Sequence, residues 1–202
     1  MKEIVKKIIP VSLTVGHPDT DEELEAMFRL RTKVYTELGY ITAESDKDEY
    51  DLENKCVYFI AKINEKLVGT SRVVIDDPLP TELYFDFEVP KKIALIPRKK
   101  RCEISRLTVI ARGMNHLVSL SLIKAMIEWA KESDCRGGYS SIIKGNLDQI
   151  LSSIGFPFHP ISSATLKYNE GLLHNYFYKG GKVLPIYYLR NESGEFMEKM
   201  KF

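Results

Sequence analysis

An acid and an arginine lie three residues apart inside an apolar stretch of the chain. Glu103 and Arg106 belong to Cys102–Ile110, whose β-branched and aliphatic residues predict a buried strand. A buried charge is costly unless it is paired or takes part in chemistry. A carboxylate in such a place can act as a general base, and an arginine can bind a carboxylate. Because side chains alternate along a strand, the two residues are expected on opposite faces unless a β-bulge intervenes.

Two further arginines interrupt apolar faces. Arg31 lies within the apolar stripe of a predicted helix, and Arg72 lies in a predicted strand that is apolar on both sides. Buried arginines need carboxylate partners, and Asp48 and Asp51 stand in the polar segment that follows the helix. Two interpretations remain open, namely a structural ion network and a polar substrate site at the edge of a sheet, where perturbed charges gather.

The composition is that of a globular protein with little net charge. The 202 residues predict one compact domain over 1–202. The 29 basic residues nearly cancel the 28 acidic ones, so no nucleic-acid partner is indicated, and the four histidines show no metal-ligand spacing. Three widely spaced cysteines predict a reducing compartment, and the lack of a long apolar run predicts a cytoplasmic protein without integral membrane association.

The elements that position these residues form a mixed α/β pattern. Strands are predicted over 4–15, 56–62, 67–75, 102–110, 139–143 and 183–189, and helices over 22–38, 115–132 and 146–153. Residues 76–101 contain four prolines and predict a long connection with short helical or extended pieces. Gly137-Gly138 is expected to end the long helix. Residues 102–143 predict a right-handed βαβ unit with parallel strands, within a mixed sheet that carries helices on both faces.

Four motifs in order carry a family resemblance. They are Arg31-Thr32-Lys33-Val34-Tyr35, Asp48-Glu49-Tyr50-Asp51, Gly69-Thr70-Ser71-Arg72 and Glu103-Ile104-Ser105-Arg106. Their order and spacing resemble the N-acyl amino acid synthases and the related acyl-homoserine-lactone (autoinducer) synthases. The segment from Val34-Tyr35 to Gly39-Tyr40 is closer to the N-acyl amino acid synthases. The resemblance implies the GNAT-type acyltransferase fold, an α/β (α+β) architecture with a mixed central sheet.

The resemblance also implies a reaction. A long-chain fatty acyl group would pass from the phosphopantetheine of acyl carrier protein to the α-amine of an amino acid, with tyrosine as a family-based guess and no bound cofactor. The amine attacks the thioester carbonyl, and a tetrahedral oxyanion collapses to an amide and a free thiol. Glu103, directly or through a water, is the expected base. Arg31 and Arg106 are expected to bind the acceptor carboxylate or to position the acids.

Further site residues follow from the same resemblance. Tyr35 and Arg72 are expected in the substrate site, and Asp48 and Asp51 are expected to anchor the loop after the first helix through the arginines. One of Phe85 and Phe87 resembles the family's acyl-pocket aromatic. Leu107 and Val109 are expected to line the substrate site, where backbone N–H groups near 107–110 would stabilise the oxyanion.

Two segments are candidates for contact with the donor. The run Arg98-Lys99-Lys100-Arg101 can attract an acidic carrier protein, although such a run is more often a solvated loop. Arg112-Gly113 precedes a predicted helix, whose first N–H groups can receive a phosphate or a pantetheine amide. Gly113 is all that remains of the glycine-rich pyrophosphate loop usual in this fold, which favours acyl carrier protein over coenzyme A.

Two alternative functions remain open from the sequence. The first is an acyl-homoserine-lactone synthase that uses S-adenosylmethionine as the acceptor. The second is a non-catalytic acyl-binding module that retains the fold and needs no base. The presence of Glu103 favours an enzyme over such a module.

Overall fold

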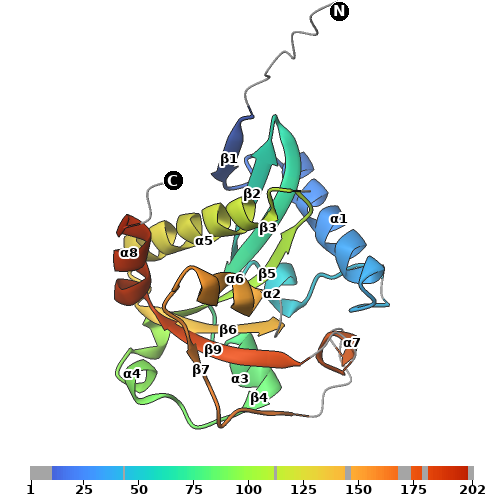
Figure 1. Cartoon of the computed structure of the whole chain (residues 1–202). Coiled ribbons are helices and arrows are strands. Elements are labelled where there is room, and N and C mark those ends of the chain that lie inside the picture. The colour runs from blue at the N-terminus through green and yellow to red at the C-terminus, as the bar shows by residue number, and fades with distance from the viewer. Residues whose placement is uncertain are drawn as a thin grey trace, which may run out of the picture.

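A seven-stranded sheet forms the centre of the protein (Figure 1). A computed structural model describes residues 11–42, 44–111, 113–143, 147–167, 174–178 and 182–199. The strand order is β1-β2-β3-β5-β6-β9-β7, and β4 and β8 form a separate pair. The strands are β1 (Leu13–Gly16), β2 (Cys56–Ile63), β3 (Lys66–Val74), β4 (Phe85–Asp86), β5 (Arg101–Val109), β6 (Gly137–Ile143), β7 (His159–Pro160), β8 (Thr165–Leu166) and β9 (Val183–Leu189).

Helices cover both faces of this sheet, as predicted (Figure 1). The helices α5 (Asn115–Glu132), α6 (Leu147–Ser153) and α8 (Arg190–Lys199) share the main apolar core on one face. The opposite face carries α1 (Asp21–Glu37), α2 (Glu49–Leu52), α3 (Pro80–Tyr84), α4 (Lys91–Ala94), the 3-10 turn η1 (Arg98–Lys100) and α7 (His174–Tyr178). This arrangement is the mixed α/β fold expected from the sequence.

Helix α1 shows why this sequence starts a helix where it does. The side chain of Thr20 accepts a hydrogen bond from the backbone N–H of Glu23, and three acidic residues in the first turn complement the helix dipole. The helix buries Met27, Phe28, Arg31 and Tyr35 against the sheet. The apolar stripe of α1, which one arginine interrupts, thus packs against the strands.

A β-bulge in β5 corrects the expected alternation of side chains. Arg72 of β3 pairs with Ser105 and Thr70 pairs with Thr108, so β5 contains one extra residue at this point. Arg106 has a φ of 57°, a left-handed conformation that is unusual for a residue other than glycine. Because of the extra residue, Arg106 lies on the same face as Glu103, and both line one cavity.

The parallel pair β5 and β6 separates soon after it begins. Its register covers only Arg101–Glu103 against Gly137–Tyr139, after which β6 continues along β9. The βαβ unit and its parallel strands are as predicted. Gly137-Gly138 was expected to end the helix, but α5 ends at Glu132 and both glycines lie in β6. A Cβ atom at Gly138 would lie 1.6 Å from the carbonyl oxygen of Cys102, so the close approach of the two strands requires glycine.

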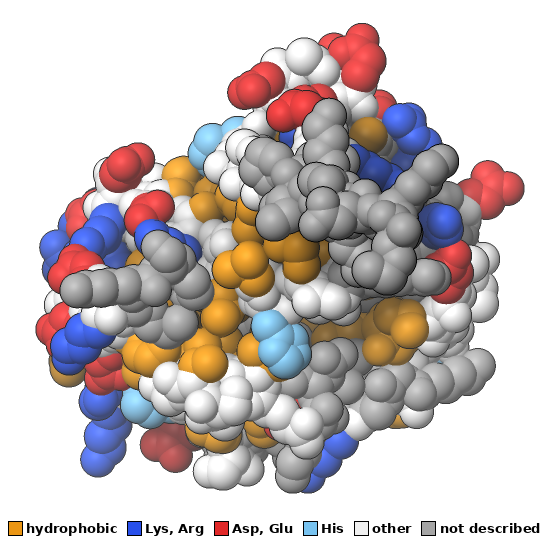
Figure 2. Space-filling model, turned by 45° about the horizontal axis from the view of Figure 1, so that its top comes forward, with side chains coloured by type: hydrophobic (Ala, Val, Ile, Leu, Met, Phe, Trp, Pro, Cys, Tyr) orange, Lys and Arg blue, Asp and Glu red, His pale blue; other side chains and the backbone are white. Residues whose placement is uncertain are grey.

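The first predicted strand and the last helix differ from the prediction. The predicted first strand, 4–15, is represented by β1 at Leu13–Gly16, and residues 4–10 of it lie outside the described residues. Helix α8 was not predicted because its sequence lacks a clear apolar stripe. The connection 76–101 contains short helical and extended pieces, as predicted, namely α3, β4, α4 and η1. No helix in the described ranges is long and apolar enough to cross a bilayer. Figure 2 shows hydrophobic side chains across the middle of one face and charged ones at its periphery.

Candidate active site

Two adjoining cavities occupy the region where β5 and β6 separate. The larger has a volume of about 230 Å³ and the smaller about 50 Å³. Their shared wall is formed by Tyr35, Ser105, Arg106, Ser141 and Tyr176. The residues around the gap between two strands of the sheet are therefore common to both cavities.

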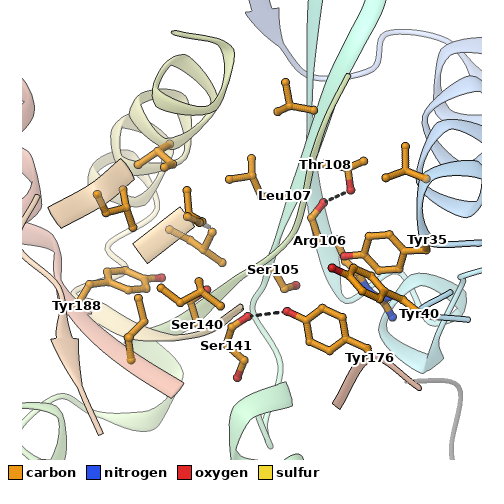
Figure 3. Close-up of a pocket in the computed structure, with 18 of the residues that line it drawn as sticks. Tyr35, Tyr40, Ser105, Arg106, Leu107, Thr108, Ser140, Ser141, Tyr176 and Tyr188 are labelled. Atoms are coloured by element: carbon orange, nitrogen blue, oxygen red, sulfur yellow. Dashed lines mark hydrogen bonds between the residues drawn. The ribbon is translucent and has the colours of Figure 1, made fainter. Parts of the chain in front are cut away.

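The larger cavity is lined by residues from both faces of the sheet. Figure 3 shows Tyr35, Tyr40 and Tyr176 on one side of β5 and Tyr188 on the other. The side that faces α5 and α6 is mainly apolar and is lined by Ile104, Ile123, Ile127, Leu147, Leu151, Phe156 and Ile186. Leu107 and Val109 line this cavity, the place where the sequence analysis expected them. The apolar side is suited to a hydrocarbon chain.

Three tyrosine rings form the wall of the other side. The rings of Tyr40 and Tyr176 meet edge to face with centroids 5.1 Å apart, and the Tyr35 ring lies parallel to Tyr176 at 6.4 Å. Only Tyr35 was predicted as a site residue. Tyr176 belongs to an aromatic segment that the sequence pattern left unassigned, so no local signal pointed to it.

Arg31 uses its guanidinium entirely within a buried ion network. Its Nε atom lies 2.6 Å from Asp46 Oδ2, and its Nη2 atom lies 2.8 Å from Asp51 Oδ2. Arg31 and Asp46 are both 0% exposed, and neither lines either cavity. Of the two roles predicted for Arg31, these contacts favour the positioning of acids. Asp46 was missed as a site residue, although it stands in the same polar segment as Asp48 and Asp51.

Arg72 and Asp48 link this network to the smaller cavity. Arg72 donates two hydrogen bonds to the Asp48 carboxylate, at 2.7 and 2.6 Å, and one from Nε to Ser105 Oγ at 3.0 Å. Asp48 also accepts a hydrogen bond from Arg106 Nη2 at 2.9 Å. Burial alone raises the pKa of Asp48, but Arg72 and Arg106 outweigh it and hold the pKa below its usual value. Asp48 therefore stays ionised between the two arginines.

Arg106 is the member of the network that retains hydrogen-bonding capacity. Its Nη1 atom is buried, makes no hydrogen bond among the described residues, and lies 3.9 Å from Asp46 Oδ2. Its guanidinium lies over the Tyr35 ring at 5.3 Å from the centroid, and the residue lines both cavities. Arg106 thus lines both cavities and has a guanidinium nitrogen that makes no hydrogen bond among the described residues, so it is suited to bind a carboxylate of a ligand.

Glu103 lines the smaller cavity and is only 2% exposed. Its Oε2 atom accepts a hydrogen bond from the backbone N–H of Thr81 at 2.7 Å, and Oε1 accepts one from Thr81 Oγ1 at 2.9 Å. Burial raises the pKa of Glu103 to about 8, although the bonds from Thr81 and the charge of Arg72 oppose the rise. A carboxyl with such a pKa can exchange a proton near neutral pH.

The predicted phenylalanines lie outside both cavities. Phe85 packs edge-on against Phe177, and Phe87 packs against Tyr139. Pro80 and the neighbouring aromatic residue Tyr84 line the smaller cavity instead. A role of Phe85 or Phe87 in binding the acyl chain therefore has no support from these two cavities.

The basic run is largely occupied by contacts within the protein. Arg98 pairs with Asp77 and Glu82, Lys100 pairs with Asp134, and Arg101 donates from Nε to the carbonyl of Ile96 at 2.9 Å. Lys99 is exposed. The run stands at the start of β5, whereas Gly113, with a φ of 76°, follows its end. Eight strand residues, 102–109, follow the run within β5 and place its far end roughly 26 Å away. Arg112 lies outside the described residues.

The fold is that of GNAT-type acyltransferases, and comparison with known proteins identifies the family. The family model described as N-acyl amino acid synthase FeeM matches residues 26–143. The chain therefore belongs to this family and is an acyltransferase. No curated protein matches the chain significantly.

Solved structures share the fold over nearly the whole chain. FeeM, an N-acyl amino acid synthase from uncultured soil microbes, is 16% identical, with a TM-score of 0.61 over 91% of this chain and 95% of its own. The AHL synthase LasI is 14% identical, with a TM-score of 0.59 over 93% and 94%. The CoA-dependent acyl-homoserine lactone synthase MesI is 18% identical, with a TM-score of 0.59 over 90% of both chains.

Proposed function

We propose that the protein transfers a long-chain fatty acyl group from acyl carrier protein to the α-amine of an amino acid, as a single-domain enzyme without a bound cofactor. One observation carries the proposal. Glu103, a buried carboxyl with a pKa of about 8, and Arg106, whose Nη1 atom makes no hydrogen bond among the described residues, line a small cavity that shares a wall with a larger one. The two cavities match an amino acid and a fatty acyl chain.

The proposed chemistry begins with the acceptor in the smaller cavity. Arg106 Nη1 binds the acceptor carboxylate, which directs the amine toward the wall that the cavities share. Glu103 receives the proton that the amine loses as it attacks the thioester carbonyl. Arg31, Arg72 and Asp48 act through Arg106, because their ion pairs fix its position.

The separated strands provide donors for the oxyanion. Beyond Glu103, β5 has no pairing with β6, so its backbone groups on that edge are not used in the sheet. N–H groups in this part of β5 can stabilise the negative oxygen of the tetrahedral intermediate and pair with the amides of a pantetheine arm. The intermediate then collapses to the amide, and the thiol leaves.

The donor is proposed to enter at the end of β5 that is followed by Gly113. A groove of about 520 Å³ lies there between α1 and the start of α5, lined by Leu30, Lys33, Val34, Glu37, Ile110 and Asn115. It shares Val34 with the larger cavity. Of the two predicted carrier contacts, we favour this end over 98–101, because the groove and the larger cavity share Val34 and most of the basic run already has partners.

The acceptor is proposed to be tyrosine or another aromatic amino acid. Tyr35 and Tyr176 line the smaller cavity together with Arg106 and offer aromatic rings against which an aromatic side chain can pack. Cys56, Cys102 and Cys135 are unpaired. With acyl carrier protein as the donor, these free thiols support the proposal that the protein works in the cytoplasm.

The test is acyl transfer by the purified protein. Long-chain acyl carrier protein and the matching acyl coenzyme A are each incubated with single amino acids or with S-adenosylmethionine, and thiol release and products are measured by mass spectrometry. The proposal predicts an N-acyl amino acid, formed faster from the carrier protein. Lactone from S-adenosylmethionine would show an autoinducer synthase instead. Thiol release with no added acceptor would contradict the proposal.

A further inference from the structure

Thr81 and Ser141 connect Glu103 to the wall that the two cavities share. Thr81 Oγ1 lies 2.9 Å from Glu103 Oε1 and 2.9 Å from Ser141 Oγ. Thr81 is 0% exposed and lines neither cavity, whereas Ser141 lines both. Figure 3 shows Ser141 facing Tyr176, whose hydroxyl donates to the Ser141 carbonyl. A row of hydrogen bonds therefore runs from the buried carboxyl to the cavities.

The protonation state of Glu103 fixes the direction of these hydrogen bonds. When Glu103 is ionised, which is the form that can act as a base, its carboxylate only accepts, and a hydroxyl carries one proton, so Thr81 Oγ1 must donate to Oε1. Ser141 must then donate its proton to Thr81 Oγ1. A lone pair of Ser141 Oγ is left as an acceptor at the shared wall. The row is thus oriented to take up a proton there.

We infer that Ser141 and Thr81 relay the proton of the acceptor amine to Glu103. The relay rests on the proposed function, because it needs an amine that attacks a thioester. As the N–C bond forms, the amine proton passes to Ser141 Oγ, the Ser141 proton to Thr81 Oγ1, and the Thr81 proton to Glu103 Oε1. Both hydroxyls stay neutral, and one proton arrives at Glu103. It returns along the same row to the thiolate when the C–S bond breaks.

The two residues have different tasks in this relay. Ser141 is a catalytic residue, since its hydroxyl meets the amine. Thr81 is a positioning residue, since its backbone N–H fixes one oxygen of Glu103 and its hydroxyl acts through Ser141. Arg98 holds the segment around Thr81 through Asp77 and Glu82, which gives the basic run a role in aligning the relay.

Several charged and titratable groups face Glu103 from the surrounding elements. Arg72 of β3 favours its ionised form, and Glu82 of α3 opposes it. The other groups that interact with it are Tyr50 of α2, Tyr139 of β6, Tyr176 of α7, Tyr188 of β9 and the neighbouring Cys102. The hydrogen bond from Thr81 Oγ1 lowers the pKa of Glu103, whereas Ser141 does not touch its carboxyl. Removing the Thr81 hydroxyl should therefore raise the pKa of Glu103, whereas removing the Ser141 hydroxyl should leave it unchanged.

The test compares Ser141→Ala, Thr81→Val and Thr81→Ser in the acyl-transfer assay. Ser141→Ala is expected to lower kcat by about 100-fold, with KM values and the acidic limb of the pH profile unchanged. Thr81→Val is expected to lower kcat similarly and to move that limb to higher pH, and Thr81→Ser restores both. Thr70→Val is the matched control, because the Thr70 hydroxyl is buried without a hydrogen bond and lines neither cavity.

Two outcomes would overturn the relay while leaving the proposed function intact. An unchanged kcat in Ser141→Ala would show that Glu103 receives the proton without the Ser141 hydroxyl. A raised KM with an unchanged kcat would show that Ser141 only binds the substrate. Infrared titration of the Glu103 carboxyl, with Glu103→Gln as the blank, needs no substrate. In this titration, the pH midpoint of the Glu103 carboxyl must be higher in Thr81→Val than in Thr70→Val. A wild-type protein that acylates no amine would instead overturn the proposed function and the relay together.

Discussion

Arg31 and Arg106 stand at opposite ends of one buried ion network and differ in what they leave unused. Arg31 is surrounded by Asp46 and Asp51 and lies away from the cavities. Arg106 gives one nitrogen to Asp48 and keeps Nη1 without a hydrogen bond at a cavity wall. Both residues interrupt apolar faces, so burial alone does not distinguish them. They differ in that Arg106 lines the cavities and has a hydrogen-bond donor that is not used among the described residues, so it can bind a ligand, whereas Arg31 has a structural role.

The largest expected effect is on catalysis at the cavity end. Glu103→Gln keeps the shape of the side chain and can still accept from the backbone N–H of Thr81, but it cannot receive a proton. We expect kcat to fall by about 1,000-fold, the range of a general base, with a thermal midpoint close to that of the wild type. Thiol release measures kcat, and thermal unfolding followed by circular dichroism measures the thermal midpoint. A variant that keeps a tenth of the activity would remove Glu103 from the chemistry.

Substitution of Arg31, at the structural end of the network, should lower the stability of the protein. Arg31→Ala leaves Asp46 and Asp51 buried without their partner. Breaking a buried pair in this way costs about 3–5 kcal/mol of the free energy of unfolding. Urea denaturation measures the loss, and the exposed pair Lys33–Glu37 offers a control, since Lys33→Ala should change stability by less than about 1 kcal/mol. Equal stability of both variants would refute the assignment.

Arg106 should show its effect in acceptor binding. Arg106→Gln removes the donor proposed for the acceptor carboxylate, and we expect the KM for the amino acid to rise by about 10-fold to 100-fold, the value of one charge-assisted hydrogen bond. The matched control is the decarboxylated amine of the same acceptor, which should react equally with variant and wild type. If the variant lost activity equally with both acceptors, Arg106 would be acting on something other than the carboxylate.

The sequence predicted the order of the main elements well and the geometry of the site only in part. The apolar periodicity of 115–132 and 183–189 gave the correct bounds of α5 and β9. The arginines were singled out because charge on an apolar face is costly. The bulge at Arg106 could not be foreseen, since it arises from the register between β5 and β3.

Residues that depend on tertiary contacts were the ones missed. Thr81 stands in a proline-rich connection whose sequence gives no hint that it meets Glu103, and Ser141 is one of two adjacent serines in a strand. One of Phe85 and Phe87 was expected from the family resemblance to be the acyl-pocket aromatic, yet the neighbouring Tyr84 is the aromatic residue that lines a cavity. Residue type predicts what a side chain can do, whereas its partners are set by segments far away in the chain.

The two acids at the cavity end should influence stability in opposite pH ranges. The pKa of Glu103 is raised from 4.5 to about 8, so its contribution to stability is complete below pH 4.5 and is lost as the pH rises through about 8. Glu103→Gln should therefore lose less stability than the wild type on going from about pH 5 to about pH 9. Asp48, with a lowered pKa, stabilises above pH 3.8 and loses this effect as the solution becomes more acidic. Urea denaturation from about pH 5 to about pH 9 measures the Glu103 effect, and the same measurement below pH 3.8 measures that of Asp48. Parallel curves for Glu103→Gln and the wild type would contradict the raised pKa.

The smallest expected effect concerns the apolar side of the larger cavity, which should change the choice of acyl chain without changing the chemistry. Leu151 of α6 lines this side and is 3% exposed. Leu151→Phe adds volume there, so the longest chains should be used less well, with a loss of about 10-fold in kcat/KM for one or two excluded methylene groups. Short chains should be unaffected, because they do not reach α6.

A control for this change comes from the same core. Met197 of α8 is buried in the apolar core on the same face but lines neither cavity. Met197→Leu keeps the volume nearly constant and should leave the order of preferred chain lengths unaltered. Competition between acyl carrier proteins with different chain lengths, read by mass spectrometry of the products, compares the two variants directly. An equal shift in both would mean that general loosening of the core, and not the cavity wall, sets the chain length.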